Sequence, residues 1–150
     1  FVDYAHSPDA LERALETLAP LTKGRLWVVF GCGGDRDTEK RAPMGRVARR
    51  VADLVIVTSD NPRTESPEAI IDDILEGIGE TSGDEVVVEV DRGRAIDRAV
   101  RSAASDDVVL VAGKGHEGYQ EIDGAQIPFD DVERVQRALE SRSEGVDESR

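Results

Sequence analysis

Four short apolar runs that alternate with segments of helical periodicity constrain the fold of this chain most strongly. The runs are rich in β-branched residues and are bounded by glycine or polar clusters, which is typical of strands buried on both faces. They cover residues 26–30, 54–58, 86–90 and 108–112, with residues 1–4 as a candidate fifth. We therefore expect an α/β, Rossmann-like fold with a mainly parallel sheet and helices on both faces.

Five segments between and after these runs carry apolar residues at helical spacing. Ser7 before Pro8, and Ser66 before Pro67, predict two helix starts, because serine caps a helix N-terminus and proline fits its first turn. The five apolar stripes are Leu11, Leu15 and Leu18; Met44, Val47, Ala48 and Val51; Ile70, Ile71, Ile74, Leu75 and Ile78; Ile96, Ala99, Val100 and Ala103; and Val132, Val135 and Leu139.

Two segments near the C-terminus, residues 119–129 and 141–150, follow different patterns. Between residues 119 and 129, Asp123-Gly124 is a hairpin turn signal, and we expect the hairpin to add an antiparallel edge strand to the sheet. Residues 141–150 are polar and aperiodic, so we expect a disordered tail after a single domain of residues 1–140.

Composition narrows the classes of partner. The 150 residues carry a net charge of −13, which disfavours nucleic acid and anionic membranes. The acidic excess, with arginine far more frequent than lysine, is compatible with adaptation to high salt or with compositional drift. No apolar run is long enough to span a bilayer, and the single Cys32 excludes an internal disulfide and fits a reducing compartment. Because the first residue is Phe1, we expect a domain cut from a longer protein.

Four segments rich in glycine and charge follow the predicted strands. They are DYAHSPD (residues 3–9), GCGGDRD (31–37), SDNPRT (59–64) and GKGHEGYQ (113–120). Ligands of open α/β sheets bind beyond the carboxyl ends of the strands. We therefore expect these four segments to form one site.

The glycine-rich segment at residues 31–36 does not match the dinucleotide-binding template. Arg36 occupies the third glycine position of G-x-G-x-x-G, where close packing of helix on strand needs a small residue. We expect a turn that lets the backbone approach a ligand, with Arg36 as an anion contact. A plain strand-to-helix turn is the alternative.

The loop at residues 60–63 is stiffened by Pro62, which fixes its own φ and restricts Asn61. It presents groups that suit a zwitterion, with Asp60 and Asn61 as acceptors for an ammonium group and Arg63 as the donor to a carboxylate. Alternatively, Asp60 and Arg63 pair with each other and only hold the turn.

The segment at residues 113–117 lacks the spacing of a phosphate loop. We expect Lys114 to contact a phosphate as a point charge and Glu117 to be a second ammonium acceptor. His6 and His116 are too few for a zinc site, so no metal site is expected. The two histidines contact a nucleotide or hold their own loops.

In their order and spacing, these four segments resemble the C-terminal domain of the Mur ligases. The resemblance covers about residues 1–140 and is strongest to the members that add meso-diaminopimelate to UDP-MurNAc-L-Ala-D-Glu. It implies a cytoplasmic, ATP-dependent ligase of peptidoglycan synthesis. In that reaction ATP phosphorylates the D-glutamyl γ-carboxylate, and the amine of the incoming amino acid attacks the acyl phosphate.

The resemblance also implies roles for individual positions. Asp3 matches a contact to the ATP ribose, and His6 lies near the nucleotide. ATP and Mg²⁺ are the implied cofactors, but the phosphate loop, the magnesium ligands and the modified lysine belong to a central domain that this sequence does not include. The implied partners are therefore the enzyme's own central and N-terminal domains, and we expect this chain alone to be inactive. The implied diaminopimelate contacts are Arg36, Asp60, Asn61, Pro62, Arg63, Gly113 and Glu117.

Small departures from the family pattern occur at Ser7, Ser59 and Gly118, and none removes a motif residue. Two other functions stay open from the sequence. One is a stand-alone α/β module that binds a zwitterionic amino acid or a nucleotide. The other is a Mur-type ligase for a different amino acid, which Arg63 disfavours for lysine.

Overall fold

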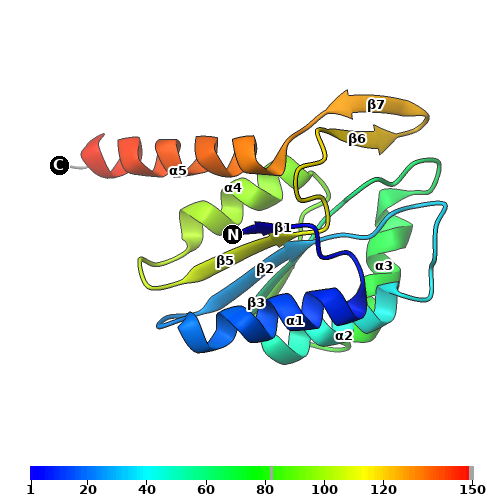
Figure 1. The fold of residues 1–150 in the computed structure, drawn as a ribbon, viewed down its shortest axis with the longest axis horizontal. Helices are drawn as coiled ribbons and strands as arrows, with labels where there is room; N and C mark the ends of the chain where they lie inside the picture. Colours follow the sequence, from blue (N-terminus) through cyan, green and yellow to red (C-terminus); the bar gives the residue numbers. More distant parts are fainter. Residues whose placement is uncertain (82, 149–150) are drawn as a thin grey trace.

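A computed structural model describes residues 1–81 and 83–148, with side-chain surroundings up to residue 143. Its centre is a five-stranded sheet in which every paired strand is parallel (Figure 1). The strands are β1 (Val2–Asp3), β2 (Leu26–Phe30), β3 (Leu54–Val57), β4 (Val86–Val88) and β5 (Val108–Ala112), in the order β1-β5-β2-β3-β4. The expected α/β fold with a mainly parallel sheet is confirmed.

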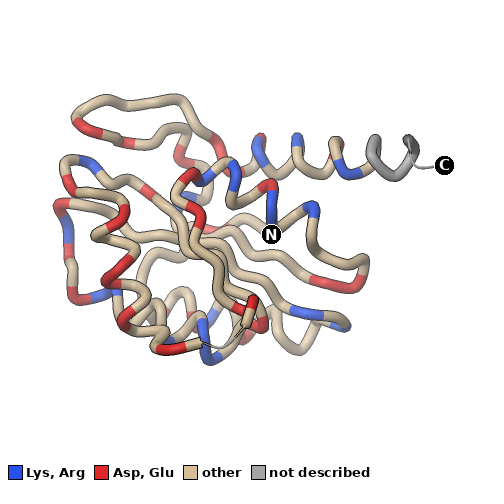
Figure 2. Tube along the Cα trace, turned by 180° about the vertical axis from the view of Figure 1, so that it is seen from behind, with Lys and Arg blue, Asp and Glu red and all other residues tan. Residues whose placement is uncertain are grey.

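Strand β2 lies at the middle of the sheet, and all five of its residues are buried. Trp27 is opposite Leu54 of β3 on one side and Val109 of β5 on the other. Strands β2 to β5 contain no charged residue, and Figure 2 shows the charged positions mainly on helices and loops. A strand with neighbours on both edges and helices on both faces has no surface for charge, which explains its continuous apolar run.

In the described residues, four α-helices and a short 3₁₀ helix lie between the strands, and a fifth α-helix follows the last strand. Two predicted starts are confirmed, because Ser7 Oγ accepts from the Ala10 N–H at 3.2 Å and Ser66 Oγ accepts from the Ala69 N–H at 3.3 Å. The helices are α1 (Pro8–Leu18), η1 (Ala19–Leu21), α2 (Arg41–Val51), α3 (Pro67–Ile78), α4 (Arg92–Ser102) and α5 (Asp131–Glu148).

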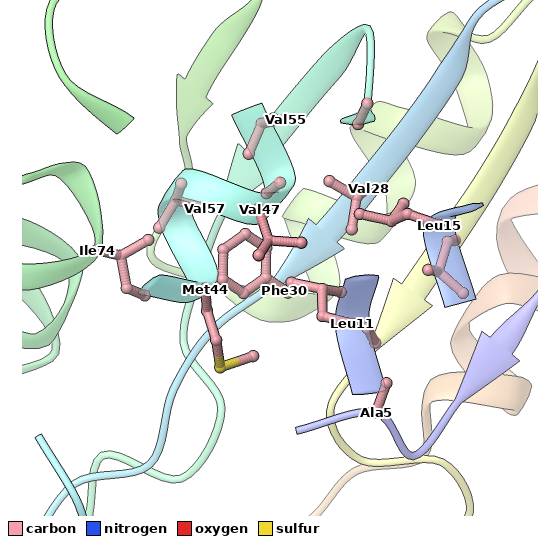
Figure 3. Packing of buried hydrophobic residues seen from close by; sticks show 14 of the residues in the cluster. Ala5, Leu11, Leu15, Val28, Phe30, Met44, Val47, Val55, Val57 and Ile74 are labelled. Atoms are coloured by element: carbon pink, nitrogen blue, oxygen red, sulfur yellow. The ribbon is translucent and has the colours of Figure 1, made fainter. Parts of the chain in front are cut away.

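The helices divide between the two faces of the sheet (Figure 1). Helices α1, α2 and α3 cover one face, where Leu11, Met44 and Ile74 pack around Phe30 and Val28 of β2 (Figure 3). Helices α4 and α5 lie on the other face. The predicted stripes of α1 to α4 thus face the sheet or a neighbouring helix, whereas in the α5 stripe only Val135 packs on the core, and Val132 and Leu139 are exposed.

The other face has its own apolar cluster, which α4 dominates. Ala95, Ile96 and Ala99 of this helix pack with Trp27 and Ile56 of the sheet. Small alanine side chains let α4 approach the strands closely, so few aromatic residues are needed to fill this half of the core.

The predicted hairpin forms but does not join the main sheet. Strands β6 (Tyr119–Ile122) and β7 (Ala125–Pro128) make a separate antiparallel sheet, and Asp123 and Gly124 have φ values of 50° and 81° in its turn. The expectation of an added edge strand is therefore wrong. The reason lies in β5, which precedes the hairpin and is already paired with β1 and β2 on its two edges.

Helix α5 also differs from the expectation, because it continues to Glu148 where the sequence analysis places a tail from Ser141. The Arg142 side chain bonds to α4, its Nη1 donating to the Val100 carbonyl. This contact ties the part of α5 beyond Leu139 to α4. Residues 149 and 150 of the expected tail lie outside the described residues. Among the helices of the described part, none is both long and apolar enough to cross a membrane.

Candidate functional site

The four charged, glycine-rich segments follow strands that are neighbours in the sheet. They follow the carboxyl ends of β1, β5, β2 and β3, which are four successive strands of the sheet. The chain runs from β2 outward to β3 and β4 and then crosses back to β5, so the direction of winding reverses between β2 and β5. Such a reversal opens a crevice where ligands of this fold class bind.

A pocket of about 360 Å³ lies at this edge and joins residues from all four segments. Seven predicted site residues line it together: His6, Arg36, Asp60, Asn61, Arg63, Gly113 and Glu117. Tyr4, Gly33, Asp37 and Lys40 complete the lining. The expectation that the four segments converge is confirmed.

A larger hollow of about 490 Å³ lies between β5, α4 and α5, away from these loops. Its lining is mostly apolar, and its charged side chains are already engaged. Asp107 accepts hydrogen bonds from Arg25 N, Trp27 Nε1 and Ala104 N, and Arg142 donates to a carbonyl of α4. The smaller, polar pocket is therefore the candidate site.

The glycine-rich loop after β2 is held against the loop after β3 by close backbone contact. The Gly34 N–H donates to the Asn61 carbonyl at 2.7 Å. A Cβ atom on Gly34 would lie 1.9 Å from the Pro62 carbonyl oxygen, and one on Gly31 would lie 2.2 Å from the Thr58 carbonyl oxygen. Only glycine permits this approach of one loop to the other, and the predicted approach of this backbone to a ligand stays a prediction.

A buried arginine that the sequence analysis missed supports the same loop. Arg41, 2% exposed, donates to the Gly33 carbonyl at 2.9 Å and to both carboxylate oxygens of Glu65. It also bonds Asp73 at 3.0 Å. The hydrogen bond from Arg41 lowers the pKa of Glu65, so this carboxylate stays charged and the loop stays tied to α3.

Asp35, in the loop after β2, also binds the loop after β3. Its Oδ2 accepts from the N–H and the hydroxyl of Thr64, at 3.0 and 2.7 Å. These hydrogen bonds lower the pKa of Asp35. The residue has a φ of 53°, a left-handed conformation that aspartate tolerates better than most side chains.

Arg63 does not pair with Asp60, so the alternative of a turn-holding pair between them is wrong. Its Nε donates to Glu121 Oε2 at 2.9 Å and its Nη1 to the Gly34 carbonyl at 2.8 Å. Its backbone, with a φ of 52°, is held by bonds to Glu121 and Asp123 of the hairpin. Within the described residues Nη2 has no acceptor, so the guanidinium offers Nη2 and the second Nη1 hydrogen to the pocket.

Asn61 and Lys114 have roles that differ from the predicted ones. Asn61 Oδ1 accepts from Lys114 Nζ at 2.6 Å and from the Glu121 N–H at 3.0 Å. Lys114 is fully buried, with Asp60 Oδ1 at 2.8 Å in an ion pair and the Tyr119 carbonyl at 3.0 Å. The ammonium group is thus surrounded by protein oxygens, and Lys114 is not among the residues that line the pocket.

The Asn61 amide therefore offers a donor to a ligand. Its Oδ1 is already occupied by two donors, and in the part of the chain that the structure describes no acceptor takes its Nδ2 hydrogens. The prediction that the Asn61 amide accepts from an ammonium group is corrected, because its oxygen faces Lys114. Asp60 and Glu117 remain as the acidic acceptors of the predicted set.

The remaining predicted residues lie at or near the pocket rim. Exposed His6 bonds through Nδ1 to the Tyr4 carbonyl at 2.9 Å, and Arg36 Nη1 donates to the Asp35 carbonyl at 2.9 Å. Asp3 is exposed outside the pocket lining and accepts from the Tyr4 N–H at 2.8 Å. The structure also places Pro62 outside the lining. Its ring is buried and stiffens the loop without contacting the pocket.

A second buried arginine anchors the strand ends beneath the pocket. Arg92 donates to the carbonyls of Ser59 and Ala112, each at 3.0 Å, and pairs with Asp131 at the start of α5. The sequence analysis did not find this residue. Arg92 and Asp131 are 39 positions apart, and no local pattern marks either one.

The charges of the pocket are mixed. Arg36, Lys40 and Arg63 supply positive charge, and Asp37, Asp60 and Glu117 supply negative charge. A ligand carrying both an ammonium and a carboxylate group complements this arrangement better than a purely anionic one. Among residues 1–81 and 83–148, no group of three or more His, Cys, Asp or Glu side chains is placed to hold a metal ion.

The sequence matches a known protein family. Residues 1–115 match the family model described as "Mur ligase, glutamate ligase domain", which is more than half of the chain. The chain belongs to the Mur ligase family. The segments that carry the pocket thus lie almost entirely within the matched part of this Mur ligase domain.

Two curated relatives of the Mur ligase domain have the name UDP-N-acetylmuramoyl-L-alanyl-D-glutamate–2,6-diaminopimelate ligase. The protein from Pseudomonas aeruginosa is 57% identical over 138 residues, which is 92% of this chain and 28% of that protein. The protein from Gloeobacter violaceus is 56% identical over 141 residues, which is 94% of this chain and 28% of that protein. The chain thus spans little more than a quarter of the length of these relatives.

A solved structure with the same name has the same fold. It superposes on this domain with a TM-score of 0.90 and 48% identity, covering 95% of this chain and 29% of that one. The five-stranded parallel sheet and the separate hairpin therefore belong to the C-terminal domain fold of this family.

Proposed function

We propose that this chain is the amino-acid-binding domain of an ATP-dependent ligase that adds meso-diaminopimelate to UDP-MurNAc-L-Ala-D-Glu in peptidoglycan synthesis. The observation that carries the proposal is the pocket, where donors from Arg63 and Asn61 lie with the carboxylates of Asp60 and Glu117. The names of relatives more than 50% identical support the same substrate.

The pocket suits one end of diaminopimelate. Each end of this amino acid has an ammonium and a carboxylate on a single carbon, so the two charges are fixed close together. The two outward N–H groups of Arg63 can meet a carboxylate in a two-point contact, and Asn61 Nδ2 can add a third bond. Asp60 or Glu117 then neutralises the ammonium group.

This arrangement predicts a preference for diaminopimelate over lysine. Lysine lacks the distal carboxylate, so Arg63 would be desolvated without an anion to bind. A site that hydrogen-bonds a polar group can reject an analogue that lacks it by about 10⁴–10⁵. Arg63 is already fixed by Glu121 and Gly34, so little entropy is lost when the carboxylate binds.

The contribution of this domain is to hold and orient the attacking amino acid. In the whole enzyme, ATP supplies the phosphoryl group that activates the acceptor carboxylate. Asp3 and His6 are exposed and stay our candidates for nucleotide contacts. In line with the family resemblance, we propose that the central domain binds phosphate and Mg²⁺ and that the enzyme works in the cytoplasm on its nucleotide-linked substrate.

The test compares amino acids in the full-length ligase that contains this domain. Arg63→Ala should raise KM for diaminopimelate by at least about tenfold and shift kcat/KM in favour of lysine. Arg63→Lys should restore little, because an ammonium group cannot make the planar two-point contact. Exposed Arg98 on α4 gives the matched control, and Arg98→Ala should change neither value. An unchanged diaminopimelate-to-lysine ratio in Arg63→Ala would contradict the assignment.

The domain by itself should not catalyse ligation. Adding ATP, diaminopimelate and the nucleotide-dipeptide to residues 1–150 should release no phosphate, while the full-length enzyme under the same conditions should release it. Release by the isolated chain would show that it holds an ATPase site of its own.

A further inference from the structure

Lys114 is the one lysine whose ammonium group is buried among the described residues, and it lies directly beneath the pocket. Three oxygens lie within 3.0 Å of Nζ, namely Asn61 Oδ1 at 2.6 Å, Asp60 Oδ1 at 2.8 Å and the Tyr119 carbonyl at 3.0 Å. Glu117 Oε1 is further away, at 3.7 Å. Nζ donates hydrogen bonds to the Asn61 and Tyr119 oxygens, and the Asp60 carboxylate completes the surroundings of the ammonium group as an ion pair.

The backbone around Lys114 directs its side chain inward. Gly113 and Gly115 have φ values of 118° and 57°, which a residue with a side chain rarely adopts. A Cβ on Gly113 would lie 3.1 Å from Asp60 Oδ2, and one on Gly115 would lie 3.1 Å from Tyr4 Cβ. The Gly-Lys-Gly segment is thus built to bring the lysine under the loop at residues 60–63.

The contact with Lys114 determines which end of the Asn61 amide faces the ligand. Asn61 Oδ1 accepts from Lys114 Nζ and from the Glu121 N–H. If the amide turned over, its NH₂ group would face two donors and lose both hydrogen bonds. The lysine and the hairpin backbone therefore hold Nδ2 toward the pocket.

We propose that Lys114 is a positioning residue for amino-acid specificity, which orients Asn61 as a hydrogen-bond donor and fixes Asp60 as an acceptor without touching the ligand. This role rests on the proposed function of the pocket. It differs from the role that the sequence suggested, in which the ammonium group contacts an ATP phosphate.

The two roles predict opposite effects on the two Michaelis constants. In the full-length ligase, Lys114→Met should raise KM for diaminopimelate by at least about tenfold, which is the effect of losing one well-placed hydrogen bond to a charged group. KM for ATP and kcat at saturating diaminopimelate should stay within about twofold, because the ammonium group meets neither nucleotide nor the reacting atoms. Exposed Lys23 provides the control, and Lys23→Met should behave as wild type.

Loss of a buried ion pair could prevent Lys114→Met from folding, so Asn61→Asp tests the same inference independently. Aspartate has nearly the shape of asparagine and can still accept from Lys114, but it replaces the Nδ2 donor with a negative oxygen. KM for diaminopimelate should rise by at least about tenfold, since an anion then faces the carboxylate of the ligand. If Asn61 instead accepted from the ammonium group of the ligand, Asn61→Asp would retain or improve binding.

Each result supports or overturns the inference. A rise in KM for ATP alone in Lys114→Met would make Lys114 a phosphate contact, and unchanged diaminopimelate binding in Asn61→Asp would overturn the amide orientation. A wild-type enzyme that does not turn over diaminopimelate would overturn the proposed function, and the positioning role with it. The two kinds of failure can be told apart, because failure of the proposed function is seen in the wild-type enzyme, whereas failure of the positioning role is seen only in the variants.

Discussion

Arg92 and Asp131 form a two-point ion pair that is buried from solvent, with Nε 2.8 Å from Oδ1 and Nη2 2.7 Å from Oδ2. Burial by itself would lower the pKa of Arg92, but the hydrogen bonds and charge of Asp131 raise it. The same guanidinium bonds the Ser59 and Ala112 carbonyls. One side chain thus ties the ends of β3 and β5, where two site loops begin, to the first residue of α5.

We expect Arg92→Met to lower the free energy of unfolding of the 150-residue chain by about 3–5 kcal/mol, because it leaves a buried carboxylate without a partner. Denaturant unfolding followed by circular dichroism measures the change. Arg50→Met is the matched control, since Arg50 pairs with Glu12 at the surface and both side chains are more than a third exposed.

The double variant Arg92→Met with Asp131→Leu separates pairing from packing. It should recover part of the lost stability, because neither buried charge is then left alone. If Arg92→Met were no more destabilised than Arg50→Met, the pair would not anchor the fold.

Gly34 should be essential for the shape of the pocket. A Cβ at this position would lie 1.9 Å from the Pro62 carbonyl oxygen and 2.7 Å from its carbon, so the two loops must move apart. We expect Gly34→Ala to reduce kcat/KM for diaminopimelate in the full-length ligase by about 10²-fold, as a displacement near 1 Å can do. Steady-state kinetics at saturating ATP measure the effect.

Gly118 is the control for this substitution, because no atom lies within 4 Å of a Cβ placed there. Gly118→Ala should therefore retain the kinetics of the wild-type enzyme. Equal losses in both variants would mean that close contact between the loops is not what the site requires.

Cys32 should be inert in the folded domain. Burial raises the pKa of its thiol from an ordinary value near 9.0 to about 12, so almost no thiolate forms at neutral pH. A chromogenic disulfide reagent at about pH 8 should label the native chain slowly and the chain in denaturant rapidly, because only thiolate reacts. Fast labelling of the native chain would contradict the burial of this thiol.

The same shift predicts a pH dependence of stability. The folded state holds the thiol proton to higher pH than the unfolded state does. The contribution of the protonated Cys32 thiol to the free energy of unfolding is therefore complete below pH 9.0 and is lost as the pH rises toward about 12. The free energy of unfolding of wild type and of Cys32→Ala, measured across this pH range, isolates the effect, because all other groups titrate in both proteins. The difference between the two free energies should shrink as the pH rises.

Salt should stabilise the isolated domain. With a net charge of −13, repulsion among acidic residues opposes the compact state, and the Debye length falls to about 3 Å near 1 M salt. The thermal midpoint should therefore rise between about 0.05 M and 2 M NaCl, a range over which screening becomes strong.

A variant with less negative charge tests the cause. Asp72 and Glu76 are exposed on α3, and replacing both with their amides should reduce the salt dependence. A midpoint that falls with salt, or a dependence unchanged in this variant, would show that repulsion among acidic residues is not the source.

Much of the fold and the place of the site could be predicted from the sequence alone. The run from Leu26 to Phe30 predicts a buried strand at its observed bounds, and Ser7 and Ser66 predict two helix starts. The convergence of the four charged segments also follows, because parallel strands end at one edge of their sheet. These features depend on near neighbours in the chain, or on a general property of parallel sheets.

Pairings within the site were decided only by the tertiary structure. Lys114 lies under Asp60 and Asn61, and Arg63 bonds Glu121 instead of Asp60. Neither pairing has a local signal, since each joins segments more than fifty residues apart. Arg92 and Asp131, 39 positions apart, also have no local signal for their pairing. The hairpin stands apart from the main sheet because β5 has no open edge. Periodicity and capping act over a few residues, whereas the partner of a buried charge depends on strand order and on which oxygens lie within reach of it.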